Sequence, residues 1–164
     1  MGTKGREIVE VNADELVKKL KIVYADEWLA YYQYWIGSKI AVGRMRGIIA
    51  KEFEEHANEE LKHAGMLTKR IIILGGIPPI SPKEIIKESG CGYADPSNPN
   101  TKKLVEQNIK SEQYAIVAYK EILNQIHHGK DPVTYNIILN ILEEEIAHED
   151  ELEAILSDMK MPVK

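Results

Sequence analysis

The sequence predicts an all-α protein built as a bundle of four long helices, and two observations support this fold class. Apolar residues recur at three- and four-residue spacing through four long segments, which is the periodicity of helices that bury one face. Glycine and proline residues mark the breaks between these segments. Because the chain has 164 residues, we expect a single domain with a sizeable core and almost no strand.

Five helices are expected, four long and one short. Their ranges, in chain order, are residues 12–41, 45–74, 82–88, 101–129 and 131–159. Asn12 and Glu15 form a capping-box pattern at the start of the first helix, and Asp131 precedes a proline at the start of the last one. Residues 1–11 are expected to form an N-terminal tail, and residues 12–160 the bundle domain.

The four long helices are expected to pair as two antiparallel hairpins. Short turns at Gly43 and Gly129 close the hairpins. Roughly 25 residues join the second long helix to the third, which is longer than most loops and leaves room for the short helix. Two hairpins joined by one long crossover are one of the known topologies of four-helix bundles.

Composition and charge narrow the range of functions. The net charge is -5 without any block of Lys or Arg, so we do not expect DNA binding, which depends on basic contacts to phosphates. No apolar run is long enough to span a bilayer, and the first residues lack the apolar core of a signal peptide. The single cysteine, Cys91, cannot form an internal disulfide. We therefore expect a cytoplasmic protein with no membrane association.

Acidic residues and histidines interrupt the apolar face of every long helix. The first and third long helices each contribute one glutamate. The second and fourth each contribute a Glu-x-x-His pattern, whose spacing places both side chains on one face. The six candidate metal ligands are Glu27, Glu60, His63, Glu112, Glu145 and His148.

The positions of these residues follow an internal two-fold pattern. Each of the four glutamates lies 16 or 17 residues from its hairpin turn, so antiparallel packing places them at one height in the bundle. Each ligand of the first hairpin also has a counterpart 85 positions later, and one pair of tyrosines keeps the same offset. The pairs are Glu27 with Glu112, Glu60 with Glu145, His63 with His148, and Tyr34 with Tyr119.

The candidate ligands bring four carboxylates into the core, where they would repel one another and where an unpaired charge is costly. Two divalent cations would cancel their four negative charges, and neutral imidazoles would complete the coordination. Oxygen and nitrogen ligands without thiolate suit iron or manganese, whereas zinc prefers fewer, tetrahedral ligands. We therefore expect two metal ions per chain, iron first and manganese as the alternative.

Three further residues share the inward faces of the helices: Tyr34, Tyr119 and His56. Each tyrosine either holds a carboxylate ligand of the opposing hairpin through its hydroxyl or simply packs in the core. His56, whose counterpart is Ile141, is either an auxiliary ligand or proton carrier, or a hydrogen-bonded histidine of the core or of an interface.

The ligand motifs resemble those of the ferritin-like superfamily, and within it the bacterioferritins and the Dps-like proteins. The resemblance covers about residues 12 to 160 and is carried by Asp26-Glu27, Tyr31 to Tyr34, Glu60 to Ala64, Ser111-Glu112, His128 to Asp131 and Glu143 to Glu149. It implies a ferroxidase centre in which two glutamates bridge two irons. The implied bridging pair is Glu60 with Glu145, and the implied terminal pairs are Glu27 with His63 and Glu112 with His148.

Two positions depart from these families. Bacterioferritins carry a haem-ligating methionine directly after the glutamate of the second helix, and Leu61 stands there in this chain, so we expect no haem. Dps-like proteins typically carry a pair of cysteines near the metal site, whereas this chain has Cys91 alone. We therefore expect no thiol-based redox accessory.

The resemblance implies a ferroxidase that oxidises Fe(II) with hydrogen peroxide or dioxygen and stores iron in a hollow homo-oligomer, a dodecamer rather than a 24-mer. Trp28, Tyr32 and Trp35 lie off the inward face of their helix, which suggests burial against another subunit. The acidic run within residues 52–59 either guides incoming Fe(II) or is a solvated face. Two other functions stay open. One is a rubrerythrin-like peroxidase or manganese-catalase-like enzyme without iron storage, and the other is a DNA-protecting or assembly protein whose metals are structural.

Overall fold

The structure is a computed structural model that describes residues 2–161, apart from the side chains of Arg6 and His128. Its helices are α1 (Thr3–Glu7), α2 (Ala13–Ile40), α3 (Arg46–Ile73), α4 (Pro82–Glu88), α5 (Thr101–Lys130) and α6 (Pro132–Lys160). The described residues include no strand, and one isolated bridge pairs Val42 with Asn100. The predicted all-α fold class is confirmed.

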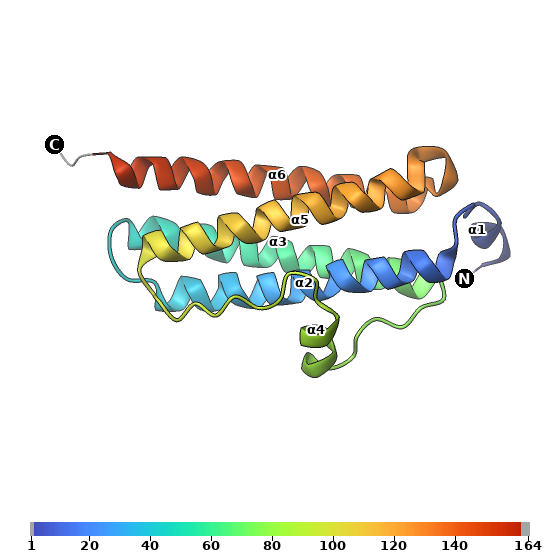
Figure 1. Cartoon of the computed structure of the whole chain (residues 1–164), viewed down its shortest axis with the longest axis horizontal. Coiled ribbons are helices and arrows are strands. Elements are labelled where there is room, and N and C mark those ends of the chain that lie inside the picture. Colours follow the sequence, from blue (N-terminus) through green and yellow to red (C-terminus); the bar gives the residue numbers. More distant parts are fainter. Residues whose placement is uncertain (1, 162–164) are drawn as a thin grey trace.

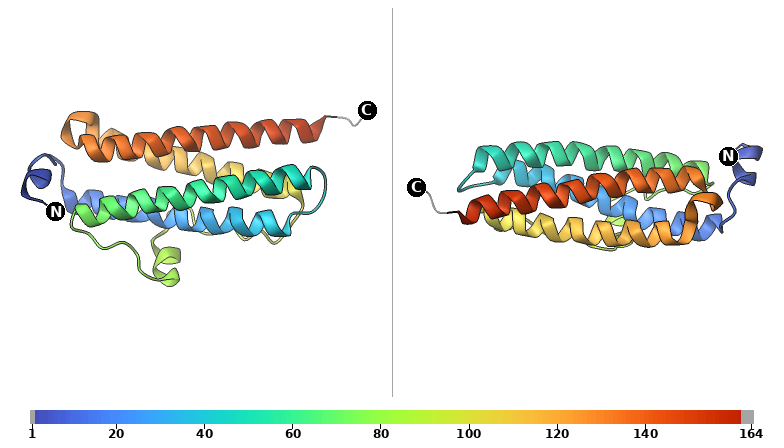
Figure 2. Two further views of the ribbon diagram at one scale, coloured as in Figure 1. Left: turned by 180° about the vertical axis from the view of Figure 1, so that it is seen from behind. Right: turned by 90° about the horizontal axis from the view of Figure 1, so that it is seen from above.

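The four long helices form two antiparallel hairpins that lie against each other (Figure 1). Helix α2 packs most extensively against α3, and α5 packs most extensively against α6. The crossover from α3 to α5 runs back along the bundle and carries the short helix α4 beside α2 (Figures 1 and 2). The structure therefore has the predicted pair of hairpins, the predicted long crossover and the short helix within it.

The starts of the long helices follow their sequence signals. The side chain of Asn12 accepts two hydrogen bonds from the first turn of α2, at 3.0 and 3.2 Å. Asp131 caps α6 in the same way, through a hydrogen bond of 3.0 Å from the backbone N–H of Thr134. Each cap satisfies backbone donors that have no partner within the helix.

Two local features differ from the expected boundaries. The expected N-terminal tail contains the five-residue helix α1, which is too short to leave a periodic pattern in the sequence. The third long helix was expected to end at Gly129, but its helical geometry already breaks at His127, where φ is 36°. A positive φ usually selects glycine, so a histidine at this position gives no sequence signal.

Two apolar clusters fill the bundle, one toward each end. One lies near the α5–α6 turn and includes Leu67 and Ile138, and the other lies near the α2–α3 turn and includes Phe53 and Leu152. Full burial of such a side chain contributes about 1.5–3 kcal/mol to folding. The two clusters leave a band of buried polar side chains between them, halfway along the bundle.

Candidate metal centre

The six predicted ligands meet in the band between the two apolar clusters. Helices α2 and α5 each supply one glutamate, α3 and α6 each supply a glutamate and a histidine, and none of the six residues is more than 3% exposed. Their candidate ligand atoms form two groups, each within 4.8 Å. The groups are Glu27, Glu60, His63 and Glu145, and Glu60, Glu112, Glu145 and His148. Glu60 and Glu145 therefore belong to both groups.

Both histidines face the carboxylates through Nδ1. His63 Nδ1 lies 3.3 Å from an oxygen of Glu27 and 3.2 Å from an oxygen of Glu60. It also lies 3.0 Å from Glu145 Oε1. The corresponding distances from His148 Nδ1 are 3.4 Å to Glu60, 3.7 Å to Glu145 and 4.0 Å to Glu112. The two histidines thus occupy equivalent positions, as the 85-residue offset predicts.

The other ring nitrogen of each histidine contacts a carboxylate outside the two groups. His63 Nε2 lies 2.8 Å from Glu144 Oε2, and His148 Nε2 lies 2.8 Å from Glu59 Oε2. Such a contact orients the imidazole and fixes which nitrogen carries the proton. The sequence pattern does not assign a role to Glu144, and it places Glu59 only in the acidic run. The two are also 85 positions apart, which is the signal that could have identified them.

The two buried tyrosines hold carboxylates of the opposing hairpin. The hydroxyl of Tyr34 on α2 donates to Glu112 Oε1 on α5, and the hydroxyl of Tyr119 on α5 donates to Glu27 Oε1 on α2. Burial and the neighbouring carboxylates raise the pKa of both phenols well above their usual value, so each hydroxyl keeps its proton to donate. These are the hydrogen bonds expected if each tyrosine holds a carboxylate of the opposing hairpin and does not simply pack in the core.

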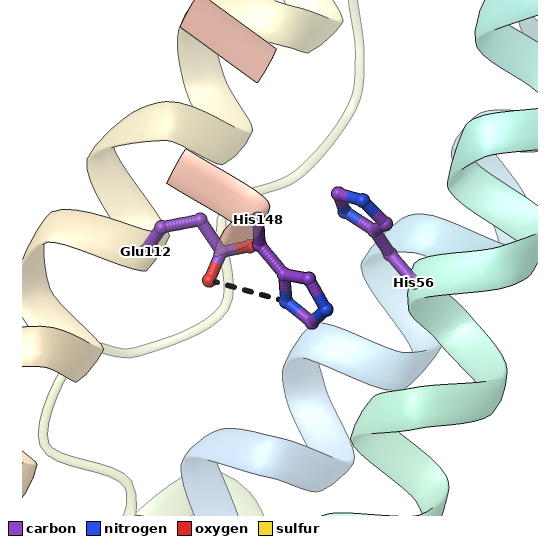
Figure 3. Close-up of side chains that lie close together, drawn as sticks. All are labelled: His56, Glu112 and His148. Atoms are coloured by element: carbon purple, nitrogen blue, oxygen red, sulfur yellow. Dashed lines mark ion pairs between the residues drawn. The ribbon is translucent and has the colours of Figure 1, made fainter. Parts of the chain in front are cut away.

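His56 lies directly beside this cluster. Its ring, which is 1% exposed, stacks on the ring of His148 with the centroids 4.1 Å apart. Figure 3 shows His56, from α3, next to the contact between His148 and Glu112. His56 Nε2 lies 3.1 Å from Glu151 Oε2, and candidate ligand atoms of His56, Glu112 and His148 lie within 4.8 Å of one another. His56 is therefore both a hydrogen-bonded histidine and a candidate ligand.

The electrostatics of the cluster disfavour ionisation of all four carboxylates without a cation. Burial raises the pKa of Glu27 and of Glu112 well above the usual value, and the charges of the two shared glutamates raise it further. For Glu60, burial also raises the pKa, but hydrogen bonds with both histidines outweigh burial and lower it. Burial and mutual repulsion therefore favour the protonated form of the two terminal carboxylates in the absence of a cation.

Several buried atoms of the cluster lie close to an oppositely charged or polar atom but lack a well-directed hydrogen bond. They are Glu60 Oε1, Glu145 Oε1 and His148 Nδ1. Two of them belong to the glutamates that both groups share. A buried polar atom without a partner is costly. Divalent cations coordinated by these oxygens and nitrogens would remove that cost, and the donor set suits iron or manganese.

Two antiparallel helix hairpins around a buried cluster of four carboxylates and two histidines define a class of helical-bundle proteins with a carboxylate-rich metal centre. Sequence comparison identifies the same class. A family model described as "Ferritin-like domain" matches residues 17–161. The chain therefore belongs to the ferritin-like family.

Two curated relatives and one solved structure are similar over most of the chain. The chain is 34% identical to the DNA protection during starvation protein of Pyrococcus furiosus, over 96% of this chain and 86% of that protein. It is 28% identical to a bacterioferritin of Brucella melitensis, over 87% and 83% of the two chains. The structure of the bacterioferritin-related protein of Bacteroides fragilis, described as a dodecameric thioferritin, has a TM-score of 0.93 and 39% identity. That match covers 96% of this chain and 95% of the other.

The remaining predicted features lie on the surface of the bundle. Tyr32 and Trp35 are 47% and 41% exposed in the single chain, and their rings stack on each other. Trp28 is partly buried and lines an apolar pocket of about 400 Å³ together with Tyr32 and residues of the crossover. None of the described helices combines the length and the apolar character needed to cross a membrane.

Cys91 lies in the crossover and contacts α2 next to a candidate ligand. Its thiol donates to Asp26 Oδ1 at 3.2 Å, and the backbone N–H groups of Gly90 and Cys91 donate to the same oxygen at 2.9 and 3.1 Å. Burial and the neighbouring carboxylate raise the pKa of the Cys91 thiol to about 12. A thiol in this state is a poor nucleophile near neutral pH.

Proposed function

We propose that this protein is a ferroxidase that binds two Fe(II) ions per chain, oxidises them with hydrogen peroxide or dioxygen, and stores the ferric product in a hollow homo-oligomer. One observation carries the proposal: two groups of four buried ligands share Glu60 and Glu145. Two groups with common members are what a pair of adjacent cations needs, because the shared carboxylates can bind both ions at once.

The residues of the cluster would have different roles in binding the two ions. Glu60 and Glu145 would bridge the two Fe(II) substrates, and each terminal pair would bind one of them. The terminal pairs are Glu27 with His63 and Glu112 with His148. Tyr34 and Tyr119 would hold the two terminal carboxylates in place through their hydroxyl groups. Two divalent ions and four carboxylates leave the buried cluster neutral, which removes the repulsion present without metal.

The chemistry balances with one oxidant per pair of ions. Each Fe(II) gives up one electron, so two ions supply the two electrons that break the O–O bond of hydrogen peroxide. With two protons, the products are two water molecules and two Fe(III). With dioxygen as the oxidant, the same two electrons and two protons give hydrogen peroxide. The protein contributes the geometry and the charge balance for these transfers.

Assembly into a cage is supported by a relative and by the surface. The similar protein of Bacteroides fragilis is described as dodecameric. In the single chain described here, Tyr32 and Trp35 expose large rings beside an apolar pocket, as expected for a surface that another subunit covers. We therefore propose a dodecamer, and the net charge of -5 favours storage over DNA binding.

Substitution of a shared ligand tests the proposal. In Glu60→Ala or Glu145→Ala, both ions lose one of their two bridging carboxylates at once, so we expect rapid Fe(II) oxidation to fall more than about 100-fold, since even residues that only support a ligand are worth 10–100-fold. Stopped-flow absorbance after mixing with peroxide measures the rate. The matched control is Glu54→Ala, an exposed glutamate on the same helix, α3, which should oxidise Fe(II) at the wild-type rate. Unchanged oxidation in both bridging variants would refute the proposal.

A further inference from the structure

A carboxylate-lined pocket opens beside the metal centre on one side. Its volume is about 340 Å³, and five glutamates line it: Glu52, Glu55, Glu59, Glu144 and Glu151. Two histidines, His56 and His148, also reach its wall, and no lysine or arginine is among the lining residues. The pocket is therefore strongly negative, and it ends at the imidazole of a candidate ligand of the centre.

Three side chains in this pocket converge on one point. Candidate ligand atoms of Glu52, His56 and Glu151 all lie within 4.8 Å of one another. His56 Nε2 is 3.1 Å from a Glu151 oxygen and 3.6 Å from a Glu52 oxygen. Two carboxylates and one imidazole form a donor set that suits a divalent cation of the first transition series.

The histidine of this trio is buried, and its hydrogen-bonding capacity is only half used. His56 is 1% exposed, its Nε2 points at the two carboxylates, and its Nδ1 has no hydrogen-bond partner. Burying an imidazole with one unpaired nitrogen costs stability.

The internal two-fold pattern shows that the fold does not need these three residues. At the 85-residue offset, the counterparts of Glu52, His56 and Glu151 are Ile137, Ile141 and Met66. All three counterparts belong to or pack against one apolar cluster, and Ile141 is fully buried. The same position in the other half of the bundle is thus filled by apolar side chains, so the polar trio serves a purpose other than packing.

The two halves of the bundle also differ in lysine pairing. Lys62 donates to both oxygens of the pocket glutamate Glu144 at 3.0 and 3.2 Å, next to the contact from His63. The counterpart of Lys62 is Ala147, which also lines the pocket and leaves Glu59 without such a lysine. The half that carries the polar trio is therefore the more negative one.

We propose that Glu52, His56 and Glu151 bind a third divalent cation in each chain. Neither of the two groups that share Glu60 and Glu145 includes these three residues. His56 also forms a candidate group with Glu112 and His148, and its ring stacks on His148, so the two sites adjoin. If the proposed ferroxidase function holds, the ion bound here is an Fe(II) on its way to the centre. The cation site itself does not depend on that function.

The test compares Co(II) binding to the assembled protein and to a variant that copies the other half of the bundle. The variant Glu52→Ile, His56→Ile, Glu151→Met carries the residues that the protein already uses at the equivalent positions. We expect it to bind one Co(II) fewer per chain than the wild type in anaerobic titration followed by calorimetry. Equal numbers in the two proteins would overturn the third site.

Two further variants control for charge and for folding. Glu54→Gln with Glu153→Gln removes the same charge from the same two helices outside the pocket, and should bind as many Co(II) ions as the wild type. Glu52→Gln with Glu151→Gln keeps His56 and the core intact, and should lose the same single Co(II). Anomalous scattering from Co(II)-soaked crystals locates the ion, and a wild-type map with no peak beside His56 would contradict the assignment.

Iron oxidation separates this inference from the proposed function. At limiting Fe(II), the Glu52→Gln, Glu151→Gln protein should oxidise iron at least threefold more slowly, with the same two ions oxidised per chain. Loss of one Co(II) with an unchanged rate would keep the third site and overturn its role in delivery. Loss of one Co(II) in a protein that oxidises no iron at all would overturn the proposed function and leave the third site standing.

Discussion

The two histidines of the centre use their ring nitrogens in the same way. Nδ1 of each faces the shared glutamates, and Nε2 of each lies 2.8 Å from an outer carboxylate. When Nε2 carries the proton, Nδ1 has a lone pair free for a cation. The outer carboxylates Glu59 and Glu144 thus support coordination without reaching the cluster, and this support is repeated in both halves of the bundle.

Metal binding should release protons, because the metal-free cluster holds them. The pKa of Glu27 and Glu112 is raised by burial, and although burial lowers the pKa of His148, bonds with Glu145 and Glu60 raise it to about 12. The pKa of His63 is also raised, by hydrogen bonds with Glu145, Glu27 and Glu60 that outweigh its burial. All four shifts favour the protonated forms, so loading two cations should release protons.

The sign of the pH dependence follows from this competition. Protons and cations compete for the same atoms, so the affinity for divalent cations should rise with pH and fall as the solution becomes more acidic. Calorimetry of Co(II) binding in two buffers with different ionisation enthalpies gives the number of protons released. No net release, or an affinity that is constant between pH 6 and pH 8, would show that the cluster is already ionised without metal.

The two tyrosine hydroxyls give a second prediction for single residues. Tyr34→Phe with Tyr119→Phe keeps both buried rings but removes the bonds that hold Glu112 and Glu27. We expect Fe(II) oxidation to slow about 10–100-fold, as is typical when the support of a metal ligand is removed. Tyr24→Phe is the control, because this buried tyrosine donates to the carbonyl of Pro79 and not to a carboxylate of the cluster. Equal rates in both variants would favour simple core packing.

Among the helices, the start of α6 is fixed by a buried ion pair in addition to its cap. Both oxygens of Asp131 accept from Arg70 on α3, at 2.8 and 2.7 Å, and Arg70 Nε donates to Thr134 at 2.6 Å. Arg70 is 4% exposed and Asp131 is fully buried. This contact joins the two hairpins at the end of the bundle, where the sequence predicts only a helix cap.

Removing one partner of this pair should be costly. Asp131→Ala leaves the Arg70 charge buried without a partner and also removes the cap of α6. We expect the protein to lose about 3–5 kcal/mol of stability, measured by denaturant unfolding at fixed protein concentration. Asp158→Ala, at an exposed position near the end of the same helix, should change the stability by less than about 0.5 kcal/mol. A loss of that small size in Asp131→Ala would mean that the ion pair contributes nothing.

The helix ends also show which local features can be predicted from the sequence and which cannot. Asn12 and Asp131 could be predicted as caps because their side chains accept hydrogen bonds from the helix backbone. The break at His127 could not, because nothing in the chemistry of histidine demands a positive φ. The helix α1 could not be predicted either, since five residues are too few to show a period.

On the scale of the whole molecule, the repeated hairpin made most of the site predictable. The offset of 85 residues links the ligands and the tyrosines, so the geometry of one half indicates the other. The polar trio around His56, which is present in only one half of the bundle, was harder to predict. The sequence showed that His56 is matched by Ile141 and that Glu52 lies one turn before it on the same helix, but only the structure brings Glu151 to it from α6. Contacts between helices far apart in the sequence leave no periodic trace.

The central claim is that the shared glutamates place two Fe(II) ions together in each chain. The most direct measurement loads the metal-free protein with Fe(II) anaerobically, adds hydrogen peroxide, and follows the iron oxidised in the fast phase while light scattering reports the mass. We predict two Fe(II) oxidised per chain and one peroxide consumed per pair, in a particle of about twelve subunits that then continues to take up iron. Catalytic peroxide turnover without further uptake would favour the rubrerythrin-like alternative. Fewer than two Fe(II) oxidised per chain would contradict the paired centre itself.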